Sequence, residues 1–137
     1  MTAYPFSLEL NVQEKDVNAR QHVSYDKYFV YFQDVRIAYL ANLGYHLDGV
    51  THIGLIAADA HCTYRKELRL GDVITAKCRI RHIQQKSFTM EFLIVRQDRI
   101  CADGSATFLC FDYDQRKVIP FPDPLVEDIK RYEGIDS

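Results

Sequence analysis

Three polar side chains lie within seven residues of one another, directly ahead of an aromatic-rich stretch: Asp16, Asn18 and His22. A carboxylate, an amide and an imidazole so close together can take up a proton, orient water and donate a hydrogen bond. Helical spacing follows them, so they should stand at a helix N-terminus. Free backbone N–H groups gather there and can polarise a carbonyl group. The stretch 16–36 is therefore predicted to carry the chemistry.

Each of these residues also has a purely structural interpretation. Asp16 could cap the loop, and Asn18 could close an Asx-turn. His22 could order the loop or lie in the core. Asn18 cannot act as a base, although it can orient water or donate to a substrate oxygen. The residue types alone leave these alternatives open.

A helix from Ser24 to Leu43 is predicted to position this segment. Ser24 is a suitable N-cap, and Gly44 stands where a helix commonly ends. Apolar residues recur along it at spacings of three and four and form one stripe: Tyr28, Phe32, Val35, Tyr39 and Leu43. The helix is therefore expected to be buried over much of its surface.

Strand patterns flank this helix in the sequence. The predicted strands cover residues 6–12, 53–68, 73–83, 88–94 and 100–113, and the run 53–68 is expected to be bent or bulged. Short turns between consecutive strands favour antiparallel pairing. A short terminal helix is predicted over 125–132. The chain is expected to form one α+β domain over residues 1–137, with an antiparallel sheet wrapped around the helix.

Composition excludes several classes of function. A net charge of −2 over 137 residues gives no general attraction to nucleic acid or to acidic membranes, and no apolar run is long enough to span a bilayer. The N-terminus does not have the pattern of a secretory signal, so a cytoplasmic location is expected. The four cysteines form no C-x-x-C pair and are predicted to be reduced, buried thiols. No metal site is expected, because His61-Cys62 lacks a second pair of ligands.

The segment Asp16–Arg36 resembles the signature of the hot-dog-fold thioesterases, in particular the group of 4-hydroxybenzoyl-CoA thioesterase and the short bacterial acyl-CoA thioesterases. The signature is roughly D-x-D-x-x-G-H-V-x-x-x-x-Y-x-x-Y-F-E-x-A-R, and this chain reads D-V-N-A-R-Q-H-V-S-Y-D-K-Y-F-V-Y-F-Q-D-V-R. Residues 64–72 resemble the family's Y-x-x-P-x-x-x-G-D turn. The resemblance covers nearly the whole chain. It implies a hot-dog fold with one long central helix, and thioester hydrolysis.

Three of the chain's departures from these motifs matter for the site. Asn18 replaces the usual catalytic aspartate, Gln21 replaces a glycine, and Glu67 replaces the proline. A plant branch of the family, the acyl-carrier-protein thioesterases, has the motifs D-V-N-Q-H-V-N-N-x-K-Y and Y-R-R-E. This chain resembles the first motif at residues 16–18 and 21–23, with residues 19 and 20 inserted, and the second motif at residues 64–67. That resemblance implies Asp16, Asn18, His22 and Glu67 as a catalytic set. Glu67 is the preferred base, although it could be an exposed charge at a strand end.

The resemblance also implies the remaining parts of the site. The backbone N–H of Tyr25 occupies the position that polarises the thioester carbonyl. Basic and polar side chains are expected to reach the coenzyme A (CoA) phosphates along a subunit boundary: Arg65, Lys66, Lys86 and Ser87. No cofactor is expected apart from the CoA of the substrate.

The expected function is therefore a cytoplasmic acyl-CoA thioesterase that assembles as a homodimer or homotetramer. An acyl carrier protein thioester is the second choice of substrate. A non-catalytic acyl-thioester binder is the main alternative, because Asn18 replaces the usual carboxylate. A hydratase or dehydratase on the same fold ranks lower, because its usual motifs are absent.

Overall fold

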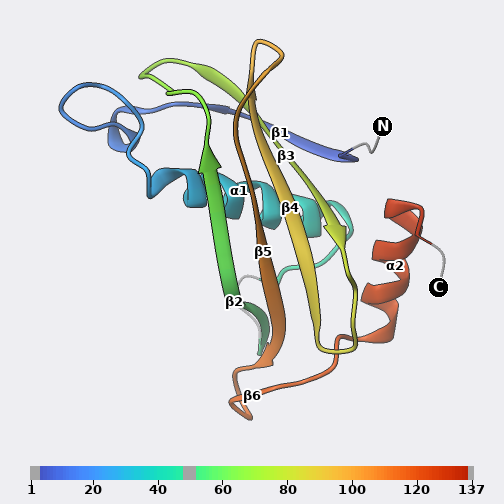
Figure 1. Cartoon of the computed structure of the whole chain (residues 1–137). Coiled ribbons are helices and arrows are strands. Elements are labelled where there is room, and N and C mark those ends of the chain that lie inside the picture. Colours follow the sequence, from blue (N-terminus) through green and yellow to red (C-terminus); the bar gives the residue numbers. More distant parts are fainter. Residues whose placement is uncertain (1–3, 48–51, 136–137) are drawn as a thin grey trace.

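The computed structural model describes residues 4–47 and 52–135, and it shows an antiparallel sheet with helix α1 packed across one face (Figure 1). The helices are α1 (Lys27–Asn42), α2 (Asp123–Glu133) and a single 3₁₀ turn η1 (Glu14–Asp16). The strands are β1 (Phe6–Asn11), β2 (Ile53–Tyr64), β3 (Val73–Arg81), β4 (Ser87–Arg96), β5 (Arg99–Asp112) and β6 (Lys117–Val118). The predicted α+β fold class is confirmed.

The sheet has the order β1-β3-β4-β5-β2, and β6 pairs with β5. All pairs are antiparallel, and short turns join β3 to β4 and β4 to β5. The β4–β5 turn has only two residues, Gln97 and Asp98, with φ of 52° and 63°. The register of β2 against β5 shifts between Ala57 and Asp59, which confirms the predicted bulge.

The core lies between α1 and the inner face of the sheet. Alternate residues of β3 and β4 point into it, because successive side chains of a strand face opposite sides. Phe32 of α1 stacks on Phe92 of β4, with ring centroids 4.5 Å apart and ring planes at 9°. Gly104 of β5 leaves room for this ring. A Cβ at position 104 would lie 2.7 Å from the Phe32 ring and 2.3 Å from the carbonyl oxygen of His61.

The structure corrects the boundaries of two predicted elements. Helix α1 begins at Lys27 rather than Ser24, because Ser24 starts a separate turn in which its carbonyl accepts a hydrogen bond from the Lys27 N–H. Strand β2 ends at Tyr64 rather than Leu68. The N–H groups of the next two residues both donate to the Cys101 carbonyl, at 2.9 and 3.1 Å, and this takes the chain off the β-ladder. Segment 65–72 is therefore a loop at the end of the sheet.

The end of α2 is tied to the rest of the fold by one buried carboxylate. Glu133 Oε2 accepts hydrogen bonds from the Tyr39 hydroxyl of α1 at 2.5 Å and from the Ile80 N–H of β3 at 2.9 Å. Its Oε1 accepts from Arg81 Nη1 at 2.9 Å, and the side chain is only 1% exposed. Burial, with the hydrogen bond to Glu133, raises the pKa of Tyr39 well above its ordinary value. One side chain thus joins both helices to β3.

Candidate active site

Residues 17–23 form a tight loop ahead of α1, which Asn18 closes. Its Oδ1 accepts hydrogen bonds from the backbone N–H groups of Arg20 at 2.9 Å and His22 at 3.2 Å. Gln21 completes the turn with a φ of 64°. The two residues inserted relative to the plant motif lie within this turn, so Asn18 and His22 remain neighbours. Asn18 is exposed, and its side-chain NH₂ donates to no group among residues 4–47 and 52–135.

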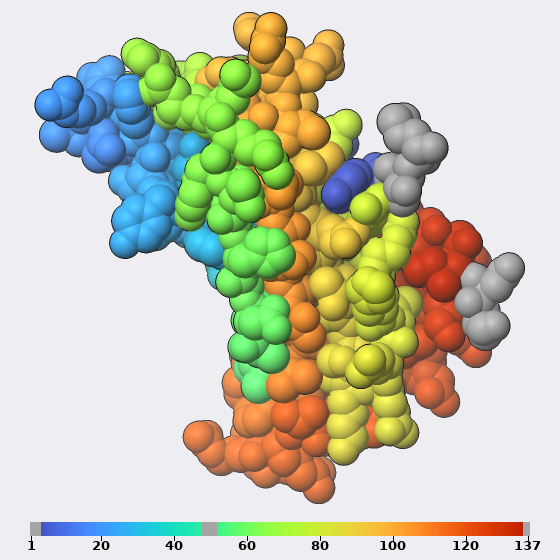
Figure 2. Space-filling model, in the orientation of Figure 1, coloured from blue at the N-terminus to red at the C-terminus, as the bar shows by residue number. Residues whose placement is uncertain are grey.

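The loop that follows β2 packs against this turn and brings Glu67 to His22. The Val23 N–H donates to the Leu68 carbonyl at 2.9 Å, and the Leu70 N–H donates to the Gln21 carbonyl at 3.2 Å. Glu67 Oε2 consequently lies 2.8 Å from His22 Nε2. In Figure 2 the green 53–72 segment and the blue N-terminal loop meet at the upper left of the molecule. The two segments lie side by side although 45 residues separate His22 from Glu67.

The His22–Glu67 pair is open to solvent. The side chains are 36% and 50% exposed, so water can reach both. Arg69 Nη2 lies 3.4 Å from the second carboxylate oxygen, Oε1, which places a cation beside Glu67. A carboxylate in contact with an imidazole can accept a proton from water and share it with the ring. The arrangement therefore supplies a base but no pre-formed nucleophile.

Asp16 lies in a different environment from the other predicted catalytic residues. Its side chain is buried, and Oδ2 accepts hydrogen bonds from the Gln13 N–H and the Tyr31 hydroxyl, both at 3.0 Å. Its own carbonyl accepts from the Ser24 N–H at 3.1 Å. Burial and the hydrogen bond to Asp16 raise the pKa of Tyr31 well above its ordinary value. These contacts bind the loop to α1, as in the capping interpretation of this residue.

Tyr25 presents free backbone groups at the entrance to α1. The residue is 75% exposed, and within the described part of the chain its N–H and that of Asp26 donate no hydrogen bond. Free N–H groups at a helix N-terminus carry partial positive charge and attract an oxyanion. Tyr25 follows His22 by three residues, so these donors and the His22–Glu67 pair are on adjoining segments.

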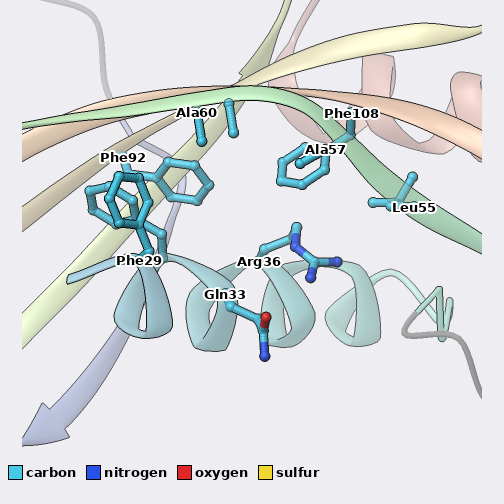
Figure 3. A pocket seen from close by; sticks show the side chains of 10 residues that line it. Phe29, Gln33, Arg36, Leu55, Ala57, Ala60, Phe92 and Phe108 are labelled. Carbon is cyan, nitrogen blue, oxygen red and sulfur yellow. The ribbon is translucent and has the colours of Figure 1, made fainter. Parts of the chain in front are cut away.

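A cavity of about 330 Å³ lies between α1 and the sheet, farther along α1 from its N-terminus (Figure 3). Four phenylalanines and three alanines make up most of its wall, which is therefore mainly apolar. Its lining residues are Phe29, Phe32, Gln33 and Arg36 of α1, Leu55, Ala57 and Ala60 of β2, Phe92 of β4, and Ala106 and Phe108 of β5. The Arg36 guanidinium lies 5.0 Å from the centre of the Phe108 ring. A cavity of this kind suits an acyl group more than a charged molecule.

The four residues predicted to contact CoA lie at two ends of the sheet. Arg65 forms an ion pair with Asp103, and Lys66 is exposed beside Glu67. Lys86 lies in the β3–β4 turn and Ser87 is the first residue of β4, at the opposite end of the sheet (Figure 1). Tyr64 pairs with Ala102 of β5 and Ser87 with Leu109, so the two groups are seven residue steps apart along β5, or roughly 23 Å at about 3.3 Å per step. One chain therefore does not bring these four residues together.

The four cysteines are free thiols, three of them buried and Cys62 half-buried. Burial raises the pKa of Cys62 and of Cys110 to about 11. The thiolate is the reactive form, and at pH 8 only about one thiol in a thousand would be ionised at such a pKa. We expect iodoacetamide at pH 8 to leave the native protein almost unlabelled and to label four thiols in urea, as read by mass spectrometry. Rapid labelling of one native thiol would contradict this expectation.

One residue of this site, Tyr64, was not identified as functional from the sequence. It donates a hydrogen bond to the Tyr25 carbonyl at 2.9 Å. Its place in segment 64–72, which resembles family motifs, was the only signal available for it. Among the described residues no helix is long and apolar enough to cross a membrane, and no cluster of three metal-binding side chains occurs.

The fold and the site together define a hot-dog domain in which an acid–base pair and free helix-start amides stand near an apolar cavity. A family model described as the thioesterase-like superfamily matches residues 12–129, and the chain therefore belongs to that superfamily. This membership supports hydrolysis of thioesters as the general activity. A curated relative, a putative esterase from Aquifex aeolicus, is 25% identical over 128 residues, which cover 92% of this chain and 98% of the relative.

Solved structures agree with this fold. A thioesterase from Thermus thermophilus, complexed with coenzyme A and Zn, has a TM-score of 0.86 at 22% identity, covering 99% of this chain and 100% of that one. A 1,4-dihydroxy-2-naphthoyl-CoA thioesterase from Synechocystis has a TM-score of 0.82 at 18% identity, covering 90% and 94%. At these identities the likeness shows the hot-dog fold.

Proposed function

We propose that this protein hydrolyses an acyl-CoA thioester to a free acid and coenzyme A. The observation that carries the proposal is the 2.8 Å contact between His22 and Glu67, on a segment adjoining the free N–H groups at the start of α1. A base and an oxyanion site are the two requirements for attack of water on a thioester. The apolar cavity along α1 supplies room for the acyl group.

In the proposed reaction, Glu67 removes a proton from a water molecule, and the resulting hydroxide attacks the thioester carbonyl carbon. The carbonyl oxygen becomes an oxyanion, which the Tyr25 N–H stabilises. The carbon–sulfur bond then breaks, and the CoA thiolate takes up the proton held by the Glu67–His22 pair. The products are one carboxylic acid and one thiol, so atoms and charge balance. His22 keeps Glu67 in position and shares its proton during the reaction.

Asn18 and Asp16 receive different roles in this mechanism. The side-chain oxygen of Asn18, Oδ1, already accepts two backbone N–H groups of the turn. The side-chain NH₂ group can donate to the attacking water or to the substrate. Asp16 keeps the loop attached to α1 through Tyr31 and is assigned no proton transfer. These roles leave Glu67 as the base.

Assembly and CoA binding are proposed together. Strand β2 forms one edge of the sheet, and its residues Ala57–His61 are exposed, so a second copy could pair there. A homodimer or homotetramer would also allow Lys66 and Arg65 of one chain to act with Lys86 and Ser87 of another on one CoA. The CoA complex of the Thermus thermophilus relative supports the choice of carrier. The cytoplasm is the proposed location, on the sequence grounds given above.

A panel of acyl-CoAs with aromatic, short and long alkyl groups, together with one enoyl-CoA, tests the proposal, with release of free thiol measured by a chromogenic reagent. We expect release from at least one member, and faster release from acyl-CoA than from the matching acyl carrier protein thioester. Binding by calorimetry without any release would instead assign a non-catalytic binder. Loss of the enoyl-CoA absorbance at constant thiol would assign a hydratase.

A further inference from the structure

The last residue of β2 reaches across to the entrance of α1. The Tyr64 hydroxyl donates a hydrogen bond to the Tyr25 carbonyl oxygen at 2.9 Å. Its ring packs edge-on against the buried ring of Tyr28, with centroids 4.9 Å apart and planes at 84°. An anchored ring leaves the hydroxyl little freedom, so it holds the carbonyl in one place.

We propose that Tyr64 is a positioning residue, whose hydroxyl fixes the Tyr25–Asp26 peptide so that the N–H groups at the start of α1 are held ready for the thioester oxyanion. The inference rests on the proposed thioesterase function and extends it to a residue that does not touch the substrate. Tyr64 acts through the peptide that it holds.

Two adjacent donors are available at this position. In the described part of the chain, the Lys27 N–H donates to the Ser24 carbonyl, whereas the N–H groups of Tyr25 and Asp26 donate to no acceptor. The Asp26 N–H belongs to the same peptide as the Tyr25 carbonyl. A hydrogen bond accepted by that carbonyl polarises the peptide and makes this N–H a stronger donor. Tyr64 therefore influences one donor electronically and the geometry of both.

The same short segment also holds the base. Glu67 follows Tyr64 by three residues, and the two intervening N–H groups, of Arg65 and Lys66, both donate to the Cys101 carbonyl of β5. Segment 64–67 is thus anchored to the sheet while one end holds the helix entrance and the other end holds His22. Groups held in a fixed relation before the reaction stabilise the transition state without rearrangement.

Tyr64→Phe tests the proposal, because it removes the hydroxyl and keeps the ring against Tyr28. Loss of a direct oxyanion donor lowers kcat by about 10²- to 10³-fold, and an indirect effect should be smaller, so we expect a fall of about tenfold with KM changed less than twofold. The matched control is Tyr132→Phe. It removes another hydroxyl-to-carbonyl bond, from Tyr132 to Pro5 at 3.1 Å, and should leave kcat unchanged.

A second measurement separates this inference from the proposed function. In amide NMR spectra, Tyr64→Phe should shift the Tyr25 and Asp26 resonances, and Tyr132→Phe should not. Unmoved resonances in Tyr64→Phe, an unchanged kcat, or equal kcat losses in both variants would overturn the positioning role. If the wild-type protein cleaves no thioester, the proposed function fails, and the amide shifts alone then decide whether Tyr64 holds this peptide.

Discussion

Glu67→Gln is expected to lower kcat for thioester hydrolysis by about 10²- to 10⁴-fold, the range associated with loss of a general base. Glutamine has nearly the same shape and can still contact His22, but it cannot accept a proton at neutral pH. The side chain is half exposed, so the unfolding temperature should change little. Thiol release from the best acyl-CoA of the panel, at saturating concentration, measures the effect.

Glu127→Gln is the matched control, because it removes a carboxylate from the exposed side of α2, away from the candidate site. It should leave kcat unchanged. His22→Ala provides the complementary test. If His22→Ala abolishes hydrolysis and Glu67→Gln does not, the imidazole is the base and the assignment of Glu67 is wrong. If neither variant affects hydrolysis, the chemistry occurs elsewhere although the thioesterase class survives.

The second large effect concerns stability. Glu133→Ala is expected to lower the free energy of unfolding by about 3–5 kcal/mol, the range for breaking a buried ion pair. The change would leave the Tyr39 hydroxyl and the Ile80 N–H without their acceptor, and Arg81 without its carboxylate. Each buried group without a partner costs about 1–3 kcal/mol. Urea unfolding followed by circular dichroism measures the loss.

Arg131→Ala is a control on the same helix. It breaks the exposed ion pair between Arg131 and Asp128, whose nitrogen–oxygen distance is 2.9 Å. An exposed pair contributes only about 0–1 kcal/mol, so the midpoint should hardly move. Equal losses in the two variants would mean that the buried Glu133 contacts contribute no more than a surface pair.

The strands were predicted well from the sequence. A sheet with one buried face requires apolar and polar residues to alternate along each strand, and this alternation is visible in the sequence. The register shift at Ala57 agrees with the bend expected in the long β2 run. The start of α1 was misplaced because Ser24 is a good N-cap by type, whereas its carbonyl here closes a separate turn. The end of β2 was misplaced because Cys101, in a distant strand, accepts the two N–H groups that leave the ladder.

The candidate site was predictable only in part. The family resemblance grouped His22 with Glu67. The spacing of these residues in the sequence could not predict their contact, because the contact requires residues 68–70 to pack against the loop before α1. The inward orientation of Asp16 depends on the hydroxyl of Tyr31, a buried aromatic residue of α1 whose type alone indicates only core packing. Tyr64 was missed for a related reason, because its partner is a backbone carbonyl and leaves no trace in residue type.

Gly104 fixes the packing of Phe32, whose ring lines the apolar cavity along α1. Any side chain at position 104 would meet the carbonyl oxygen of His61, which is backbone and cannot swing aside, as well as the Phe32 ring. Saturation mutagenesis should therefore return only glycine there. Ala57, Ala60 and Ala106, in contrast, line the cavity itself. Attempts to redesign acyl selectivity would therefore begin at these three alanines and leave Gly104 unchanged.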